Sequence, residues 1–148
     1  RQSMISRRAS SSGSSFRIGW LMMRRTEVRD LADRGFEIGG HTISHPILKE
    51  LPDDEARREI IDCRRWVKEV TGTAPASFAY PNGRSGVDFD ERHVAMVREA
   101  GFAAAASTDW GFAAASSHAL RLPRTGPWWR QGRRFNVGLI RSYLRSYV

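Results

Sequence analysis

Helix-like and strand-like segments alternate along this chain of 148 residues, and that alternation constrains the fold more than any other feature. Apolar residues recur at helical spacing in residues 24–36, 51–72, 88–102 and 135–147. Short apolar or small-residue runs, typical of strands, occupy residues 36–42, 76–83, 102–108 and 119–124. Strands that alternate with helices of this length indicate parallel βα units. We therefore expect one α/β domain, which also suits the length of the chain.

Capping residues and glycines mark the ends of the expected helices. Thr26 is the expected N-cap of the first helix, and Asp53 or Asp54 that of the second. Glycine is favoured just after a helix, and Gly35, Gly72 and Gly101 are expected to end three of the four helices. In the last helical segment the apolar residues Leu139, Ile140, Tyr143 and Leu144 are expected on one side.

The chain is basic, with 24 Lys and Arg against 16 Asp and Glu and a formal net charge of +8. This balance permits binding to an anionic polymer, and an arginine-rich binding module is one reading of it. The arginines are interspersed with Asp and Glu along the helical segments, however, as on solvated helix faces. One small cluster, Arg130, Arg133 and Arg134, stands out. We expect no nucleic-acid partner.

Residues 1–19 are rich in Ser and Arg, and we expect a loop or a disordered arm there, because such a segment buries little apolar surface. The folded domain is expected over residues 20–148. No run of about 18 apolar residues is present, and no signal-peptide pattern is visible. These observations predict no membrane span. They do not identify a compartment, and the bacterial cytoplasm and the cell envelope are both compatible with the chain.

Four short motifs follow the expected strands: GGHTISHP, YPNG, STDWG and LPR. Ligand sites of parallel α/β folds gather at the carboxyl ends of the strands, so these motifs are expected on one face. GGHTISHP holds His41 and His45, and its flanking Gly and Pro residues argue against a helix interior. A tight loop could bring the two imidazoles to one metal ion. The alternative is a capping or core pair, with Thr42 and Ser44 satisfying backbone groups.

The same motifs, with an EAGF segment and an Ala-rich strand between them, resemble the polysaccharide deacetylases, the NodB-like carbohydrate esterases of family 4, in their FAYP-type branch. The resemblance covers about residues 20–124. It implies a distorted (β/α) barrel and a hydrolase of non-peptide carbon–nitrogen bonds that removes N- or O-acetyl groups from polysaccharide sugars. It suggests a role in cell-envelope or exopolysaccharide metabolism.

The resemblance also implies a divalent metal held by one aspartate and two histidines, which correspond to His41 and His45. Zn²⁺ is the first expectation, with Co²⁺, Ni²⁺ or Mn²⁺ as alternatives. Such an ion lowers the pKa of bound water and polarises the acetyl carbonyl. By the same resemblance, the backbone N–H of Asn82 would stabilise the oxyanion.

Other candidates are less specific. Tyr80, Pro81 and Trp110 are expected to contact the sugar, and core packing is the alternative for Tyr80 and Trp110. Arg124 could supply a guanidinium that many relatives carry at the position of Ala79, and a structural salt bridge is its alternative.

The remaining His and Cys residues are not expected to be catalytic. His93 and His118 are expected to be solvated rather than to act as a general acid. Cys63 is the single cysteine and is expected to be a half-buried, inert thiol.

The chain departs from the family at its start. The TFDDG-type motif, which supplies the catalytic base and the third metal ligand, is absent, and Glu27 and Asp30 lie in a helical context instead. We therefore expect an incomplete barrel without its N-terminal strands, with weak metal binding and little catalysis by this chain alone. A catalytically inactive carbohydrate-binding or interaction module of the same fold is the alternative. An uncovered sheet edge would favour aggregation or dimerisation.

Overall fold

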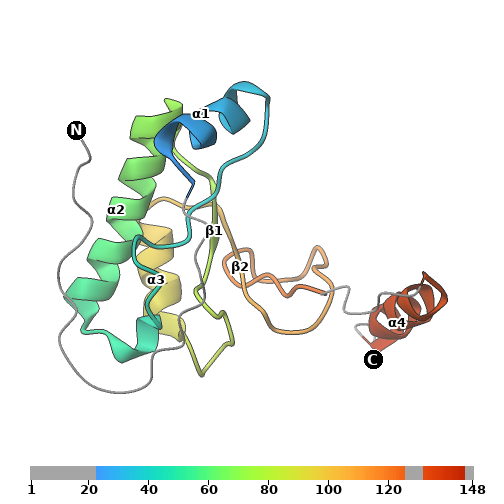
Figure 1. Ribbon diagram of the computed structural model, residues 1–148. Helices are drawn as coiled ribbons and strands as arrows, with labels where there is room; N and C mark the ends of the chain where they lie inside the picture. Colours follow the sequence, from blue (N-terminus) through green and yellow to red (C-terminus); the bar gives the residue numbers. More distant parts are fainter. Residues whose placement is uncertain (1–22, 126–131, 146–148) are drawn as a thin grey trace, which may run out of the picture.

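The computed structural model describes residues 23–125 and 132–145 (Figure 1). Its elements, in chain order, are α1 (Arg25–Asp33), the 3-10 helix η1 (Leu48–Glu50), α2 (Asp53–Thr71), β1 (Ser77–Ala79), α3 (Glu91–Glu99), β2 (Ala104–Ala106) and α4 (Gly132–Arg145). The expected arm over residues 1–19 lies outside the described residues.

β1 and β2 are parallel neighbours, with Phe78 opposite Ala105. Single parallel bridges, Gly40 to Phe78 and Ala106 to Leu122, add one pass of the chain on each side. The sheet therefore has four parallel passes in sequence order. This α/β arrangement confirms the expected fold class, whereas the described residues do not close a barrel.

The predicted strands over residues 36–42 and 119–124 are wrong in extent, because each pairs through a single bridge. Gly39 and Gly40 supply no side chains for packing on a pleated sheet, which weakens a strand. On the other side, Leu122 donates to Ala105 O and accepts from Ser107 N, both at 2.8 Å. Pro123 follows at once and has no N–H to continue the ladder.

α2 and α3 pack against each other and run beside β1 and β2 (Figure 1). Their apolar faces and the strands form one hydrophobic core. Its most deeply buried members are Leu48, Ala56, Ile60, Phe78, Tyr80, Phe89, Val94, Val97 and Ala105. Removing apolar surface from water contributes about 25 cal/mol per Å², and it is the main stabilising contribution to such a domain. The core sits below the carboxyl ends of the strands and fixes the loops that leave them.

The helix starts differ from the expected caps by one or two residues. α1 is capped at Arg24, whose N–H donates to Glu27 at 2.6 Å, so Thr26 already lies inside the helix. α2 is capped at Pro52, and Asp53 and Asp54 occupy its first turn. Carboxylates in this position stabilise the helix by interacting with the positive end of its dipole. The helix end is as predicted, because Gly72 adopts the left-handed conformation (φ 80°) that terminates α2.

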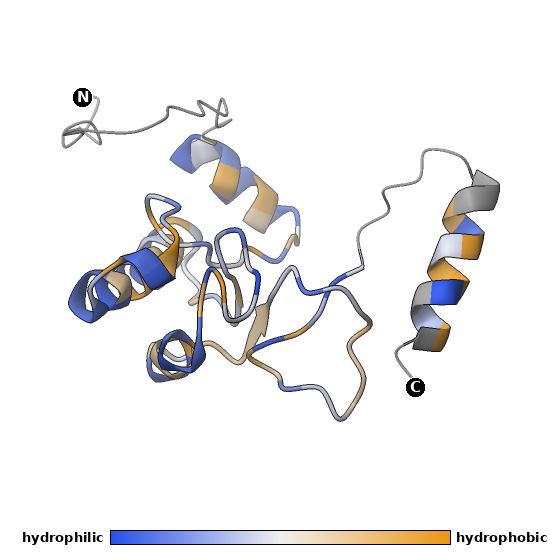
Figure 2. Cartoon of the chain, turned by 90° about the horizontal axis from the view of Figure 1, so that it is seen from below, coloured by the Kyte–Doolittle hydropathy of each residue, from blue (hydrophilic) through white to orange (hydrophobic). Residues whose placement is uncertain are grey.

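α4 confirms the last predicted helix, and Figure 2 shows hydrophobic positions along it. Phe135 of α4 is half-buried, whereas five large apolar residues of this helix are exposed: Val137, Leu139, Ile140, Tyr143 and Leu144. The Tyr143 ring contacts that of Phe112 edge-on, with centroids 5.7 Å apart. Among the described helices, none has both the length and the hydropathy needed to cross a bilayer.

Candidate metal and acyl-transfer site

The four loops expected on one face do leave the same edge of the sheet. The parallel bridges place His41, Tyr80, Ser107 and Pro123 just beyond the paired residues of the four passes. Hydrogen bonds join neighbouring loops: Thr108 donates through its N–H to Gly83 O at 2.7 Å and through Oγ1 to Asn82 O at 2.6 Å. This edge is therefore a continuous, cross-linked surface.

His41 is held through one ring nitrogen. Its Nδ1 lies 2.7 Å from the Ala79 carbonyl oxygen at the end of β1. A carbonyl only accepts, so Nδ1 is the donor, and in the neutral ring Nε2 would present a lone pair. Histidines that bind metals are commonly oriented in this way by a carbonyl on the other nitrogen. The backbone N–H of His41 also donates to the Cys63 thiol, at 3.2 Å to Sγ.

His45 lies beside His41, with ring centroids 4.8 Å apart and an interplanar angle of 73°. Its N–H donates to Thr42 Oγ1 at 3.2 Å. Burial lowers the pKa of His45, and the neighbouring His41 lowers it further. A lowered pKa favours the neutral imidazole, which is the form that binds a divalent metal.

The loop between the two histidines is conformationally demanding. Thr42 and His45 both have φ of 58°, in the left-handed region that non-glycine residues rarely adopt. Each such residue costs on the order of 1 kcal/mol, so external contacts must hold the loop. Gly40 enters it where a Cβ would lie 2.9 Å from the Phe102 ring, so only glycine fits there.

α2 supplies the contacts that hold this loop. One carboxylate oxygen of Glu59 accepts the N–H groups of Ile43 and Ser44 at 2.8 and 2.9 Å. The other accepts the Ser44 hydroxyl at 2.7 Å. Sequence reasoning missed Glu59. Its spacing of four residues from Cys63, which places both on one helix face, was the available signal.

The His41 and His45 pair gives two candidate metal-binding side chains. The described residues contain no group of three or more His, Cys, Asp or Glu side chains arranged around one point. Cys63 does not complete the pair, since it is 5% exposed and burial raises the pKa of its thiol. Cys63 was expected to be half-buried, but it is buried, and its reactivity stays a prediction.

Asn82 presents its backbone at the same edge. It has φ of 56° and an exposed side chain, and its N–H has no acceptor within the part of the chain that the structure describes. Gly83 follows with φ of 79°, and a Cβ there would lie 3.0 Å from both Thr108 N and Tyr80 O. The turn therefore projects a backbone N–H from a tightly packed support.

The expectation that Tyr80 and Pro81 contact the sugar is wrong. Tyr80 is 1% exposed, stacks on Phe89 with centroids 3.7 Å apart and donates its hydroxyl to Leu120 O at 2.9 Å. Pro81 is also fully buried. The core alternative holds for Tyr80 because an aromatic ring gains more free energy in the apolar interior than at a wet edge. Trp110 is 47% exposed, so it remains accessible to a ligand.

Arg124 makes backbone contacts rather than the salt bridge considered for it. Its Nε donates to Ser107 O at 2.6 Å, and its N–H donates to Asp109 O at 2.9 Å. These bonds join the last two loops of the edge.

The two other histidines have different environments. His118 is exposed, as expected, and lies 3.4 Å from an Arg98 nitrogen. His93 was expected to be solvated, which is wrong, because it is 0% exposed. It accepts the Asp90 N–H at Nδ1 and donates from Nε2 to Leu48 O, both at 3.1 Å. These bonds satisfy the ring inside the core, where sequence periodicity alone cannot place it.

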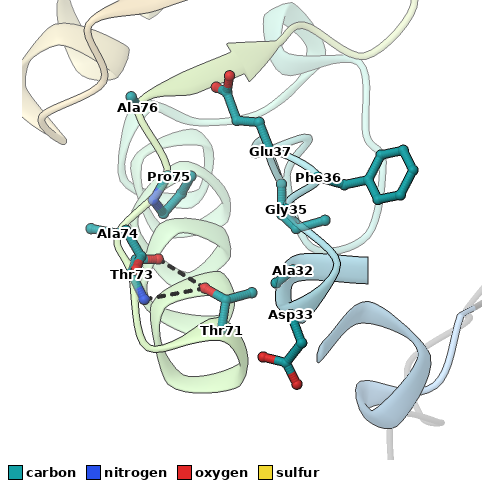
Figure 3. A pocket seen from close by; sticks show the side chains of 11 residues that line it. Ala32, Asp33, Gly35, Phe36, Glu37, Thr71, Thr73, Ala74, Pro75 and Ala76 are labelled. Carbon is teal, nitrogen blue, oxygen red and sulfur yellow. Dashed lines mark hydrogen bonds between the residues drawn. The ribbon is translucent and has the colours of Figure 1, made fainter. Parts of the chain in front are cut away.

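A separate cavity of about 410 Å³ lies at the opposite edge of the sheet. Figure 3 shows it between the end of α1 and the segment that follows α2. Its lining residues precede the strands, for example Ile38 and Ala76, and Thr71 and Thr73 hydrogen-bond to each other on one wall. It is therefore remote from the histidine pair.

The polysaccharide deacetylase family model matches residues 5–105, and the chain belongs to this family. A peptidoglycan-N-acetylglucosamine deacetylase of Bacillus cereus is 38% identical over 56 residues, which are 38% of this chain and 20% of the relative.

Solved structures share the fold. The Streptococcus pyogenes deacetylase PplD, in complex with acetate, aligns with a TM-score of 0.64 and 20% identity over 70% of this chain and 44% of that protein. A Bacillus cereus polysaccharide deacetylase aligns with a TM-score of 0.59 and 22% identity over 68% and 31%. The chain thus spans less than half the length of these relatives.

Proposed function

We propose that this chain contributes part of the active site of a metal-dependent hydrolase that removes acetyl groups from polysaccharide sugars. The observation that carries the proposal is the pairing of His41 and His45, with the proton of His41 Nδ1 held by Ala79 O, at the carboxyl edge of the sheet. Family membership supports the same chemistry, since polysaccharide deacetylases are generally metal-dependent.

His41 and His45 would hold the metal, with Zn²⁺ the first candidate for two neutral imidazoles. When bound, such an ion supplies Lewis acidity toward an acyl oxygen and lowers the pKa of a water. His41 is pre-oriented by Ala79 O, and His45 is kept neutral by its lowered pKa. A third protein ligand would have to come from outside the described residues. Because the described residues hold no group of three candidate ligands, they are expected to bind the metal weakly on their own.

The Asn82 N–H would donate to the oxygen of the acetyl group as negative charge develops on it. The left-handed turn at Asn82 leaves this N–H without an internal acceptor among the described residues. Trp110, exposed on the neighbouring loop, would pack against the sugar ring. The Arg124 guanidinium would act indirectly, by tying that loop to the strand end.

The proposed substrate is an N-acetylated amino sugar within a polysaccharide. A relative that is named as a deacetylase of N-acetylglucosamine in peptidoglycan supports this choice. The alternative is a catalytically inactive carbohydrate-binding module, and the two-histidine donor set without a described carboxylate is the observation that favours it.

Calorimetric titration of the purified chain with Zn²⁺, followed by acetate release from acetylated chito-oligomers, tests the proposal. We expect micromolar or weaker Zn²⁺ binding that disappears in the double variant His41→Ala, His45→Ala and persists in His118→Ala, which changes an exposed histidine away from the pair. Binding that is indifferent to His41 and His45 would refute the metal role. Sugar binding without any acetate release would favour the inactive module.

A further inference from the structure

Glu59 is the one acidic side chain that hydrogen-bonds to the backbone of the histidine loop in the described residues. Its carboxylate accepts from Ile43 N, Ser44 N and Ser44 Oγ at 2.7 to 2.9 Å. The two backbone donors lie between His41 and His45, and no other acceptor for them occurs among the described residues. Three bonds to an ionised acceptor form a strong, directional clamp.

The clamp acts where the backbone is least favourable. Thr42 and His45, which flank the two clamped amides, both have φ of 58°. A carboxylate that takes two successive N–H groups requires these amides to point the same way. The left-handed residues produce such an arrangement. Without the carboxylate, the two N–H groups lose their protein acceptor and the loop loses the contact that selects this conformation.

Glu59 is also rigidly placed. It lies on α2 next to Ile60, which is 0% exposed in the core, and four residues before Cys63, whose sulfur accepts the His41 N–H. The nearby Arg58 pairs with Asp54 at 3.0 Å, and no ion pair to Glu59 is formed within residues 23–125 and 132–145. The Glu59 carboxylate is therefore committed to the loop and not to a surface cation.

A groove of about 370 Å³ runs along this contact. It is lined on the loop side by Ile43, Ser44 and Pro46 and on the α2 side by Glu55, Glu59 and Asp62. Glu55 lies one helical turn before Glu59, and its carboxylate accepts no hydrogen bond from the described residues. It therefore offers a matched acidic control on the same face of the same helix.

We propose that Glu59 is a positioning residue that sets the separation of the His41 and His45 rings through the backbone between them. This inference rests on the proposed function in one respect only, the use of the two rings to bind a metal. The loop-ordering part rests on the hydrogen bonds of Glu59 alone. Glu59 hydrogen-bonds to Ile43 and Ser44, and it is not assigned to the chemistry.

The test compares Glu59→Ala, Glu59→Gln and the control Glu55→Ala. Amide hydrogen exchange, measured by NMR without metal, reports on the N–H groups of Ile43 and Ser44. We expect exchange at both amides to accelerate at least tenfold in Glu59→Ala, less in Glu59→Gln, whose amide oxygen still accepts, and not at all in Glu55→Ala. Unchanged exchange in Glu59→Ala would overturn the proposal.

Zn²⁺ titration is the second readout. We expect the affinity to fall at least tenfold in Glu59→Ala, with partial rescue in Glu59→Gln and parent-like binding in Glu55→Ala. Equal affinity in Glu59→Ala and the parent chain would overturn the positioning role. If the parent chain binds no Zn²⁺, the proposed function fails while the exchange arm still decides the role of Glu59 in the loop. If Glu59→Ala does not fold, Glu59→Gln is used for both comparisons. A Glu59→Gln variant that keeps both the parental amide protection and the parental Zn²⁺ affinity would then overturn the proposal.

Discussion

Arg84 forms a bidentate ion pair with the buried carboxylate of Asp88. Arg84 Nε donates to Oδ2 and Nη2 to Oδ1, both at 3.0 Å, and the Arg84 N–H adds a third bond at 2.9 Å. Asp88 is 1% exposed, whereas the Arg84 side chain is largely exposed. The contact closes residues 84–88, the loop that follows the turn at Asn82 with the candidate oxyanion donor.

We expect Asp88 to make stability sensitive to acid. The hydrogen bonds from Arg84 lower the pKa of Asp88 in the folded protein. Its contribution to stability is therefore fully present above the unfolded value of about 3.9 and is lost as the pH falls through the lower folded value. Urea unfolding between pH 7 and pH 2.5 measures this, with Asp88→Asn as the comparison. An identical loss of stability in both proteins over that range would contradict the assignment.

We expect His93 to make the free energy of unfolding depend on pH in a higher range than Asp88 does. Burial is the largest effect on the pKa of His93 and lowers it, although Asp90 opposes the shift. A depressed pKa means that the stabilisation is complete above the unfolded value of about 6.5 and declines as the pH falls below it. His93→Gln should unfold with less pH dependence between pH 7.5 and 5 than the parent. His118→Gln, at an exposed position, should keep the parental dependence, and a flattened curve there instead would count against His93.

Substitution of Gly83 should destabilise the turn at the site. In Gly83→Ala, the new methyl group would meet Thr108 N and Tyr80 O at 3.0 Å in addition to the cost of φ 79°. We expect a loss of about 2–3 kcal/mol, which combines left-handed strain and overpacking. Gly86→Ala is the matched control, since φ is 74° but nothing lies within 4 Å of the added Cβ. It should cost about 1 kcal/mol. Equal losses in thermal unfolding would show that packing around Gly83 is not limiting.

Tyr80→Phe tests the corrected position of Tyr80. The change removes the hydroxyl that donates to Leu120 O, and leaves that carbonyl without its partner in the core. We expect a loss of about 1–2 kcal/mol in the free energy of unfolding. Binding of a chito-oligomer should stay at the parental level. Weaker binding in a variant of unchanged stability would return Tyr80 to the substrate site.

The local order of the chain was accessible from sequence. The alternation of helical and strand-like segments predicted the parallel α/β arrangement, and glycines such as Gly72 marked helix ends because only they adopt positive φ without strain. The loop of His41 and His45 was identified as a candidate site, since ligands gather where parallel strands end. The caps at Arg24 and Pro52 were missed by one or two residues, because a periodic pattern does not fix the exact end of a helix.

The arrangement of side chains was decided by packing across the chain. Tyr80 and His93 are polar at their tips and lie at positions where periodicity allows either exposure or burial. The core buries both because Leu120 and Leu48, 40 and 45 residues away, supply acceptors for them. Glu59 reads as one more acid on a solvated helix until folding brings α2 to the histidine loop. Sequence by itself determined which segments form helices and strands and which loop carries the histidines, since these follow from local periodicity. Only the tertiary structure decided which polar groups meet, because a hydrogen bond between distant residues depends on the packing of everything between them.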